Sequence, residues 1–410
     1  MTHRRRSLAG DERGAVLVQV AIALLVLIAM ATFVVDHGVM WVSRGQAQNA
    51  ADAGALSGAI ARAYDELTSP PASNGKAFNS AMGAALANNV WTAAPTAQVS
   101  WACPTGIAGS CVRVDVYRNG EFGSTPLPTI FGKLLNISSQ GVRATATARV
   151  ATGNATNCMR PFSVADKWIE IGGSVNEFNH WEKGKELNPH DDYVPPSGSS
   201  SGSGFRLPDD FGQPVTLKSG NPNSGSEAIT SGWHLPVRLP DGLGGYVSGG
   251  SDYSAAIANC IGHPVSIGQY LPLENGVMNG PTKAGIDELV AKDPGASWDA
   301  ASKRITGSCV PGCAPISPRV VPITVFDIDE FQWRSAGPGD WSSAWKTYPA
   351  NPCPTGGKCV RVANILGFFV DGMSGSDVVG HLTSYPGEFA AGAPSVGGGA
   401  AFLMNIQLVR

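Results

Sequence analysis

The sequence predicts an α+β protein: an N-terminal transmembrane helix continues into a long helix packed on a small sheet, and a mainly-β, loop-rich domain follows. Three observations predict it. Positions 14–35 are apolar and uncharged, small residues then recur at helical spacing, and Gly and Pro, 51 and 29 in the whole chain, give turn signals every few residues after position 152. We therefore divide the chain into residues 1–13, 14–35, 36–152 and 153–410.

The composition excludes two classes of protein. A disordered chain is excluded because 43% of the residues are hydrophobic and ten are Trp, which can bury a sizeable core. A net charge of -3 and a pI of about 6.2 give no basic field that would hold phosphates, so no nucleic-acid partner is expected. At 410 residues the chain exceeds what one core usually serves, which predicts more than one folded region.

The first predicted element is a membrane-spanning helix from Gly14 to Val35. Its roughly 22 residues, at about 1.5 Å each, cross a bilayer core of about 30 Å. Four arginines precede it, at positions 4, 5, 6 and 13, whereas Asp36, His37 and a single nearby cation, Arg44, follow it. The positive-inside rule then puts the N-terminus in the cytoplasm and the rest of the chain outside.

A cleaved secretory signal is the alternative, with Ala29-Met30-Ala31 as its cleavage site. The apolar run exceeds the usual signal core of about 7–15 residues and continues to Val35, beyond that site. We therefore expect a retained anchor.

The eight cysteines all follow the apolar run, which agrees with an oxidising compartment and disulfides. Proximity in sequence ranks the pairs Cys103–Cys111, Cys309–Cys313 and Cys353–Cys359 first, leaving Cys158 with Cys260. Proximity only ranks them, because eight cysteines allow 105 connectivities. A zinc site is disfavoured, since no pair has C-x-x-C spacing.

The helix is predicted to continue through residues 38–67, which contain no Pro. A stripe of small residues follows one face of it: Ala47, Ala51, Gly54, Gly58 and Ala61. Such a stripe lets another backbone approach closely. Either it packs within its own domain, or it receives a partner helix in an assembly.

Shorter elements complete the prediction. In the first region these are a helix over 76–89, strands over 98–101, 112–117 and 142–150, and a short helix over 129–135. In the second they are strands over 320–326 and 360–370 and a short helix over 285–291. No repeat of 20–50 residues is evident, which disfavours a solenoid or a propeller.

The sequence offers no catalytic or cofactor-binding constellation, so we expect no enzyme, no cofactor and no small-molecule substrate. The G-x-S-x-G match at 198–202 lacks the strand and helix that a nucleophile elbow needs. The five histidines beyond the helix are scattered without a metal-ligand pairing: His180, His190, His234, His263 and His381.

Two acidic patterns keep a metal hypothesis open. Asp191, Asp192, Asp209 and Asp210 bracket a Gly/Ser-rich loop and could offer oxygens to calcium. The run from Asp371 to Ser376 resembles the metal-adhesion motif of von Willebrand A domains, with the serine spacing off by one. The alternative function is therefore a membrane-tethered extracytoplasmic calcium-dependent binding module or hydrolase.

The N-terminal region resembles TadE/TadG-like proteins of the Flp (tight adherence) pilus-assembly system. Three stretches carry this resemblance: 13–16 (RGAV), 35–38 (VDHG) and 48–56 (QNAADAGAL). More loosely, residues 158–168, 251–253, 280–282 and 317–319 are similar to the long outer portion of TadG-like members.

The resemblance implies a single-pass protein of the bacterial cell membrane with a pilin-like helix-plus-sheet region outside it. It implies a non-enzymatic role in pilus assembly, adhesion and biofilm formation, with other Tad/Flp assembly proteins as partners. Gly14-Ala15 would be its prepilin-type cleavage site. Gln19 stands where prepilins carry Glu, so we expect an uncleaved anchor rather than a processed pilin-like subunit.

Overall fold

The computed structural model describes residues 12–65, 71–107, 109–166, 205–207, 209–219, 233–308, 316–326, 331, 353–396 and 401–409. The chain divides into two compact units. The first comprises Met1–Arg62, Ser69–Val150 and Ile406–Arg410, and the second comprises Ala63–Thr68 and Ala151–Asn405.

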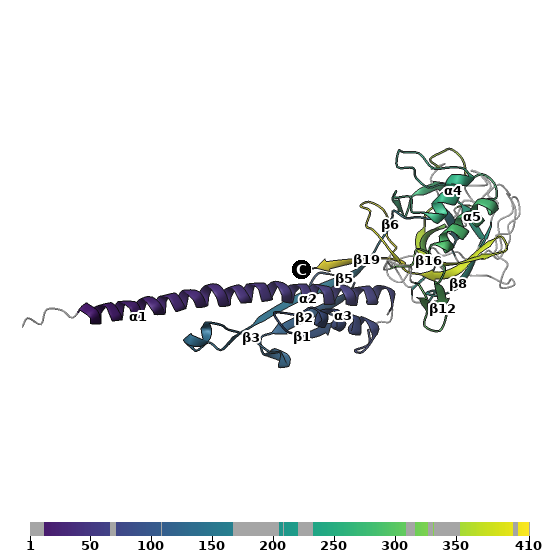
Figure 1. The fold of residues 1–410 in the computed structure, drawn as a ribbon. Coiled ribbons are helices and arrows are strands. Elements are labelled where there is room, and N and C mark those ends of the chain that lie inside the picture. The colour runs from purple at the N-terminus through teal and green to yellow at the C-terminus, as the bar shows by residue number, and fades with distance from the viewer. Residues whose placement is uncertain are drawn as a thin grey trace, which may run out of the picture. The chain divides into compact units, whose positions relative to one another are not determined.

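A long helix opens the chain (Figure 1). It consists of α1 (Glu12–Ala31), a π-helical turn η1 (Thr32–Asp36) and α2 (His37–Tyr64). No Pro interrupts it, so its backbone hydrogen bonds run on through the change from apolar to mixed sequence. The predicted N-terminal apolar helix is confirmed.

A second helix and an antiparallel sheet complete the first unit. The helix is α3 (Lys76–Ala87), and the strands β1 (Thr96–Ser100), β2 (Ser110–Arg118) and β5 (Val142–Thr152) are neighbours in that order. β19 (Leu403–Val409) follows β5 in the sheet order, and its residues from Ile406 belong to this unit.

The core of this unit joins valines of the sheet to alanines of the two helices. Its fully buried members include Ala47, Ala51, Ala81, Ala85, Val112, Val114 and Val116. Alternation in β2 points these valines to one face, as the period of two predicts. Because alanine side chains are short, the helices lie close to the sheet.

A hairpin-like loop connects β2 to β5. It contains a 3₁₀ turn η2 (Glu121–Gly123), strand β3 (Leu127–Pro128), a 3₁₀ turn η3 (Gly132–Leu135) and strand β4 (Ser139–Gln140). The short helix expected over 129–135 is thus one 3₁₀ turn. It ends at Asn136, whose φ of 65° leaves the helical region.

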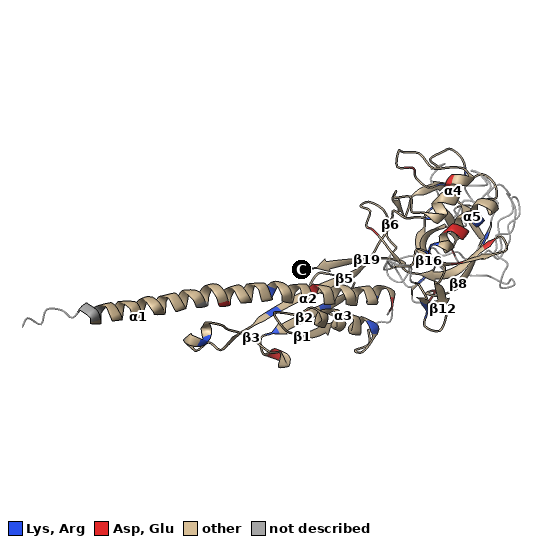
Figure 2. Cartoon of the chain, viewed as in Figure 1, with Lys and Arg blue, Asp and Glu red and all other residues tan. Residues whose placement is uncertain are grey.

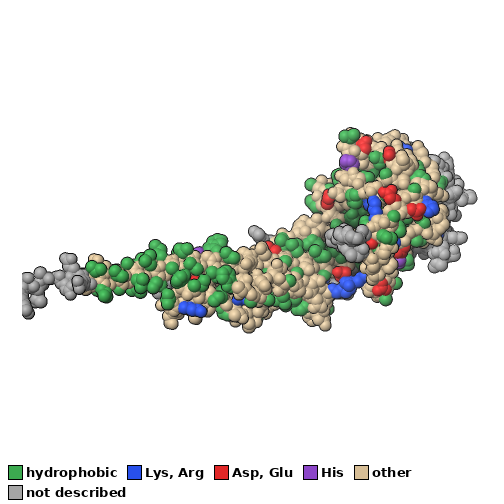
Figure 3. All heavy atoms as spheres, in the orientation of Figure 1, with side chains coloured by type: hydrophobic (Ala, Val, Ile, Leu, Met, Phe, Trp, Pro, Cys, Tyr) green, Lys and Arg blue, Asp and Glu red, His purple; other side chains and the backbone are tan. Residues whose placement is uncertain are grey.

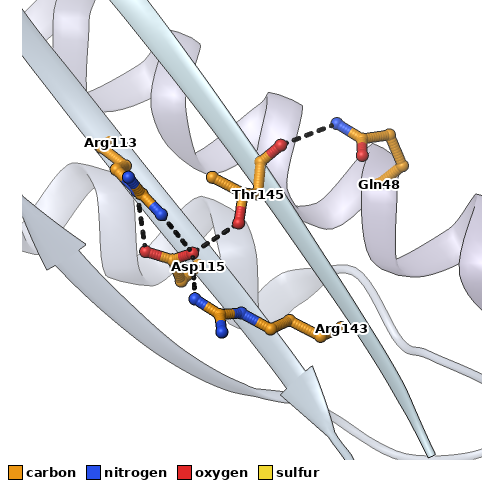
Figure 4. A network of polar contacts seen from close by, with 5 residues as sticks. All are labelled: Gln48, Arg113, Asp115, Arg143 and Thr145. Atoms are coloured by element: carbon orange, nitrogen blue, oxygen red, sulfur yellow. Dashed lines mark hydrogen bonds and ion pairs between the residues drawn. The ribbon is translucent and has the colours of Figure 1, made fainter. Parts of the chain in front are cut away.

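The other face of the sheet carries a charged network centred on Asp115 (Figure 4). Arg113 Nε lies 3.0 Å from Asp115 Oδ2, and Arg143 Nη2 lies 3.1 Å from Oδ1. The Thr145 hydroxyl also donates to Oδ1, and Gln48 of α2 donates to the Thr145 carbonyl at 3.3 Å. Burial raises the pKa of Asp115, but the hydrogen bonds from Arg113, Thr145 and Arg143 outweigh burial and lower the pKa overall. The network ties α2 to the sheet.

The second unit is built on a closed barrel of mixed parallel and antiparallel strands. Its order is β14 (Val320–Phe326), β16 (Asn364–Ser374), β17 (Asp377–Thr383), β8 (Pro214–Ser219), β9 (Trp233–Pro236) and β7 (Phe162–Ala165). One cluster, with Phe162, Leu217 and Phe368 among its members, fills the core. The mainly-β character of this region is confirmed.

Two helices pack against this core: α4 (Gly250–Ala258) and α5 (Asn279–Ala291). α5 starts six residues before the predicted helix at 285. Short strands complete the unit: β6 (Ala155–Thr156), β10 (Val265–Ser266), β11 (Tyr270–Pro272), β12 (Ser297–Asp299), β13 (Arg304–Thr306), β15 (Cys359–Arg361) and β18 (Tyr385–Pro386).

The strand predicted over 360–370 is two strands, β15 and β16. The backbone N–H of Val362 donates to Gln269, next to β11, whereas that of Ala363 donates to Val325 of β14. The chain changes its pairing partner between these two residues, which a continuous apolar run does not reveal.

Three of the predicted cysteine pairs lie at disulfide distance. Their Cα atoms are 5.2 Å apart for Cys103–Cys111, 4.5 Å for Cys158–Cys260 and 5.5 Å for Cys353–Cys359. Cys309 and Cys313 lie outside the described residues.

Candidate functional site: the apolar helix and its junction

The apolar part of the long helix has no covering within the structure. Leu17, Leu27 and Phe33 are 71%, 65% and 69% exposed. In Figure 2 the described ribbon of this stretch carries neither the blue of Lys and Arg nor the red of Asp and Glu, and Figure 3 shows hydrophobic side chains gathered along it. Among the described residues this is the one helix long and apolar enough to cross a membrane. A helix apolar all round needs an apolar environment.

Beyond Asp36 the same helix changes character, because one face becomes buried in the first unit. The five stripe residues Ala47, Ala51, Gly54, Gly58 and Ala61 are all buried there. A Cβ placed on Gly58 would lie 2.7 Å from Val112 Cγ1 and 2.8 Å from Ala81 Cβ. At Gly54 and Gly58 the stripe therefore packs on α3 and β2 of its own unit.

Asp36 stands at the junction of the two parts and holds a loop against the helix. The backbone N–H groups of Ile130 and Phe131 donate to its Oδ1 at 2.8 and 3.4 Å, and that of Gly132 donates to Oδ2 at 2.6 Å. The Gln140 amide also donates to the Asp36 carbonyl at 3.0 Å. We call residues 129–137 the junction loop.

The Asp36 carboxylate is 5% exposed and compensated by backbone donors alone. Burial raises its pKa, but the three N–H groups together outweigh burial and lower the pKa below the ordinary 3.8. Gly132 suits this contact, since a Cβ there would lie 3.0 Å from Asp36 Oδ2. The carboxylate thus holds the junction loop against the helix.

We expect Asp36→Asn to weaken docking of the junction loop at neutral pH by about 1.5–3 kcal/mol, because an amide N–H₂ would face a backbone donor. A pKa lowered by folding means that wild-type docking is fully present above pH about 4 and is lost as pH falls through the folded-state pKa. The variant should lack this pH dependence. Hydrogen exchange at residues 130–132 measures both effects.

Asp52→Asn is the matched control in the same helix, because asparagine keeps an acceptor for the Gln48 amide that bonds Asp52. It should leave exchange at residues 130–132 unchanged. Equal exchange protection at residues 130–132 in Asp36→Asn and the wild type would show that the Asp36 carboxylate does not hold the junction loop.

Aromatic side chains line the helix across the junction. The Phe33 and His37 rings stack with centroids 5.5 Å apart, and Trp41 Nε1 donates to His37 Nε2 at 2.8 Å. Trp41 is 66% exposed. Aromatic residues with polar atoms at the end of an apolar span are typical of the membrane–water interface.

The remaining predicted site residues do not converge. Gly14 and Gln19 are exposed on the helix surface, and the side chain of Ala15 lies outside the described ones. Asp210 is buried and accepts from the Arg206 N–H at 2.7 Å, while Asp209 is exposed. Positions 191, 192 and 198–202, and two histidines, His180 and His190, lie outside the described residues.

The stretch that resembles an adhesion motif forms the β16–β17 hairpin, in which Asp371 pairs with His381 at 2.8 Å. His234 is buried, and burial lowers its pKa to about 4. Within the described ranges, no three His, Cys, Asp or Glu side chains gather in a group that could hold a metal ion.

Asp36 lies inside the segment that a family model matches. Residues 14–62 match the family model Tad, Flp pilus-assembly TadE/G-like. This Tad segment contains the apolar helix, Asp36 and the small-residue stripe. The resemblance to TadE/TadG-like proteins is confirmed for it, and the match does not extend to the looser similarities from residue 158 onward.

No curated protein gives a significant match to the chain. No solved structure gives one either. The functional evidence from comparison therefore lies in the Tad segment.

The sequence places Asp36 at the flank of the apolar run and within the stretch 35–38 that resembles the family, but it does not reveal the partners of this carboxylate. Those partners follow it by 94 to 96 positions. The available signal was a lone carboxylate directly after an apolar span, which must find donors or stay in water.

Proposed function

We propose that this chain is a membrane-anchored, extracytoplasmic structural component of Flp (Tad) pilus assembly. The family match supports a role related to pilus assembly. The proposal also includes single-pass anchoring in the bacterial cell membrane with a cytoplasmic N-terminus. It further includes a contribution to adhesion and partnership with other Tad proteins. We assign it no catalytic activity and no cofactor.

One observation carries the anchoring: a single helix is apolar and exposed before Asp36, then packed within a folded unit after it. A soluble helix buries its apolar residues, and a cleaved signal has no reason to continue into a core. Here residues 37–62 supply part of the core of the first unit, so the apolar part continues directly into the folded part.

The orientation follows from charge and cysteine chemistry. Arginines precede the span at positions 4, 5, 6 and 13, which favours a cytoplasmic N-terminus. Three cysteine pairs at disulfide distance suit an oxidising compartment for everything beyond the span.

The function is tested by deleting the gene in its native bacterium and counting surface Flp pili by electron microscopy. We expect pili to be lost and to return with the wild-type gene. Intact mass of the membrane-purified protein reports processing: a chain starting at Met1 supports a retained anchor, and one starting at Ala15 indicates a processed pilin-like subunit. Normal pilus number and surface adhesion without the gene would refute the proposal.

A further inference from the structure

We propose that the junction loop, residues 129–137, inserts apolar side chains into the headgroup region of the leaflet from which the helix emerges, as a second membrane contact. This inference rests on the proposed membrane anchor. The occupant of the surface is the lipid bilayer itself.

The position of the loop is fixed by Asp36. Asp36 directly follows the apolar run, and its carboxylate binds three consecutive N–H groups of the loop at 2.6–3.4 Å. In Figure 1 the loop that continues from β3 lies alongside the helix near the change from α1 to α2. A helix inserted up to Val35 therefore brings this loop to the membrane surface.

Among the described side chains of the loop, three of the five exposed ones are apolar, and the other two are Lys133 and Asn136. Ile130, Leu134 and Ile137 are 52%, 66% and 51% exposed, and Lys133 is exposed beside them. Three large aliphatic side chains with one cation within eight positions resemble the composition of interfacial segments, in which apolar groups enter the acyl boundary and lysine meets lipid phosphates.

The neighbouring surface favours lipid over a protein partner. Phe33 and Val34, three and two residues before Asp36, are 69% and 65% exposed, so the exposed apolar side chains of the anchor extend to within one helical turn of the residue that holds the loop. A specific protein interface buries about 800 Å² on each partner, which three side chains on a short loop do not supply by themselves. Contact with the bilayer needs no such area.

The test uses the full chain with the substitution Leu134→Cys, labelled at this cysteine with an environment-sensitive fluorophore. The labelled chain is reconstituted in vesicles of phosphatidylcholine in which about one lipid in five is phosphatidylglycerol. Leu86→Cys is the matched control. Leu86 is 38% exposed and follows Ala85 in α3. Ala85 packs beside Gly54, which lies 18 residues beyond Asp36 in the long helix. That separation is about 27 Å along the helix. The unsubstituted chain gives the labelling blank.

We expect the label at position 134 to show blue-shifted emission and to be quenched about twofold or more by lipids with headgroup-level nitroxides. The label at position 86 should show neither. Equal quenching at both positions would overturn the inference. Shielding at position 134 that disappears on dilution of the protein in lipid would overturn it too, because the occupant would be a second copy.

Vesicle flotation separates the two proposals. A chain that does not float refutes the anchor, whereas a floating chain with an unquenched label refutes only the loop contact. If the labelled variant misfolds, hydrogen exchange supplies the second readout. The triple substitution I130S/L134S/I137S should speed exchange over the junction loop of the full chain in vesicles, because serine side chains do not hold the loop in the bilayer. Equal exchange rates in vesicles for the triple variant and the wild type would overturn the inference.

Discussion

Replacing Leu24 and Leu27 together with arginine is expected to release the chain from the membrane. The two side chains are 57% and 65% exposed, so neither belongs to the buried core of the structure. Each lies near the middle of the apolar run, where arginine costs about 2.5–3.5 kcal/mol of insertion free energy. A combined cost of about 6 kcal/mol should abolish stable insertion. Resistance of the membrane fraction to alkaline carbonate measures it.

The control for this variant replaces the same two leucines with alanine, which shortens the side chains without adding charge. It should remain in the membrane fraction, because the run stays uncharged over Gly14–Val35. An arginine variant that sediments with membranes as the wild type does would refute the span. Loss of the alanine variant from the membrane fraction as well would contradict the assignment of the arginine effect to charge.

Replacing Gly54 and Gly58 together with leucine is expected to unfold the first unit. A Cβ at Gly54 would lie 3.0 Å from Ala85 Cβ, and one at Gly58 would lie 2.7 Å from Val112 Cγ1. Overpacking costs about 1–3 kcal/mol at each site, and leucine adds three more carbons to each Cβ. The sum is a large part of a typical stability of about 5–15 kcal/mol. Thermal melting and hydrogen exchange over α3 and β2 measure it.

Gly45→Leu is the matched control, since it lies on the same helix with nothing within 4 Å of the added Cβ. It should melt at or slightly above the wild-type temperature, because glycine costs a helix about 0.5–1 kcal/mol relative to alanine. A double glycine variant that melts normally but assembles no pili would return the stripe to an assembly role. Normal melting with normal pili would contradict the packing described here.

The stripe illustrates how far local pattern reaches. Spacing of three and four placed Ala47, Ala51, Gly54, Gly58 and Ala61 on one helical face, which required only helix geometry. Which backbone approaches that face depends on where α3 and β2 pack, and no local signal specifies that. Only the contacts at Gly54 and Gly58 distinguish packing within the first unit from packing against a partner helix.

The second unit was predicted less completely for the same reason. The strand over 320–326 was predicted at its observed bounds, because a continuous apolar run is a local signal. Closure of six strands into a barrel joins segments from Phe162 to Thr383, and the order of those strands is not a local property. The break between β15 and β16 likewise depends on a change of partner.

What the sequence by itself determined is the long helix, its apolar first part and the Tad segment, because length, hydropathy and absence of Pro act within one stretch of chain. Only the tertiary structure decided the role of Asp36. Its carboxylate could have remained in water; instead it meets three N–H groups 94 to 96 positions later. A buried charge takes whichever donors the fold brings to it, and the fold alone places the junction loop there.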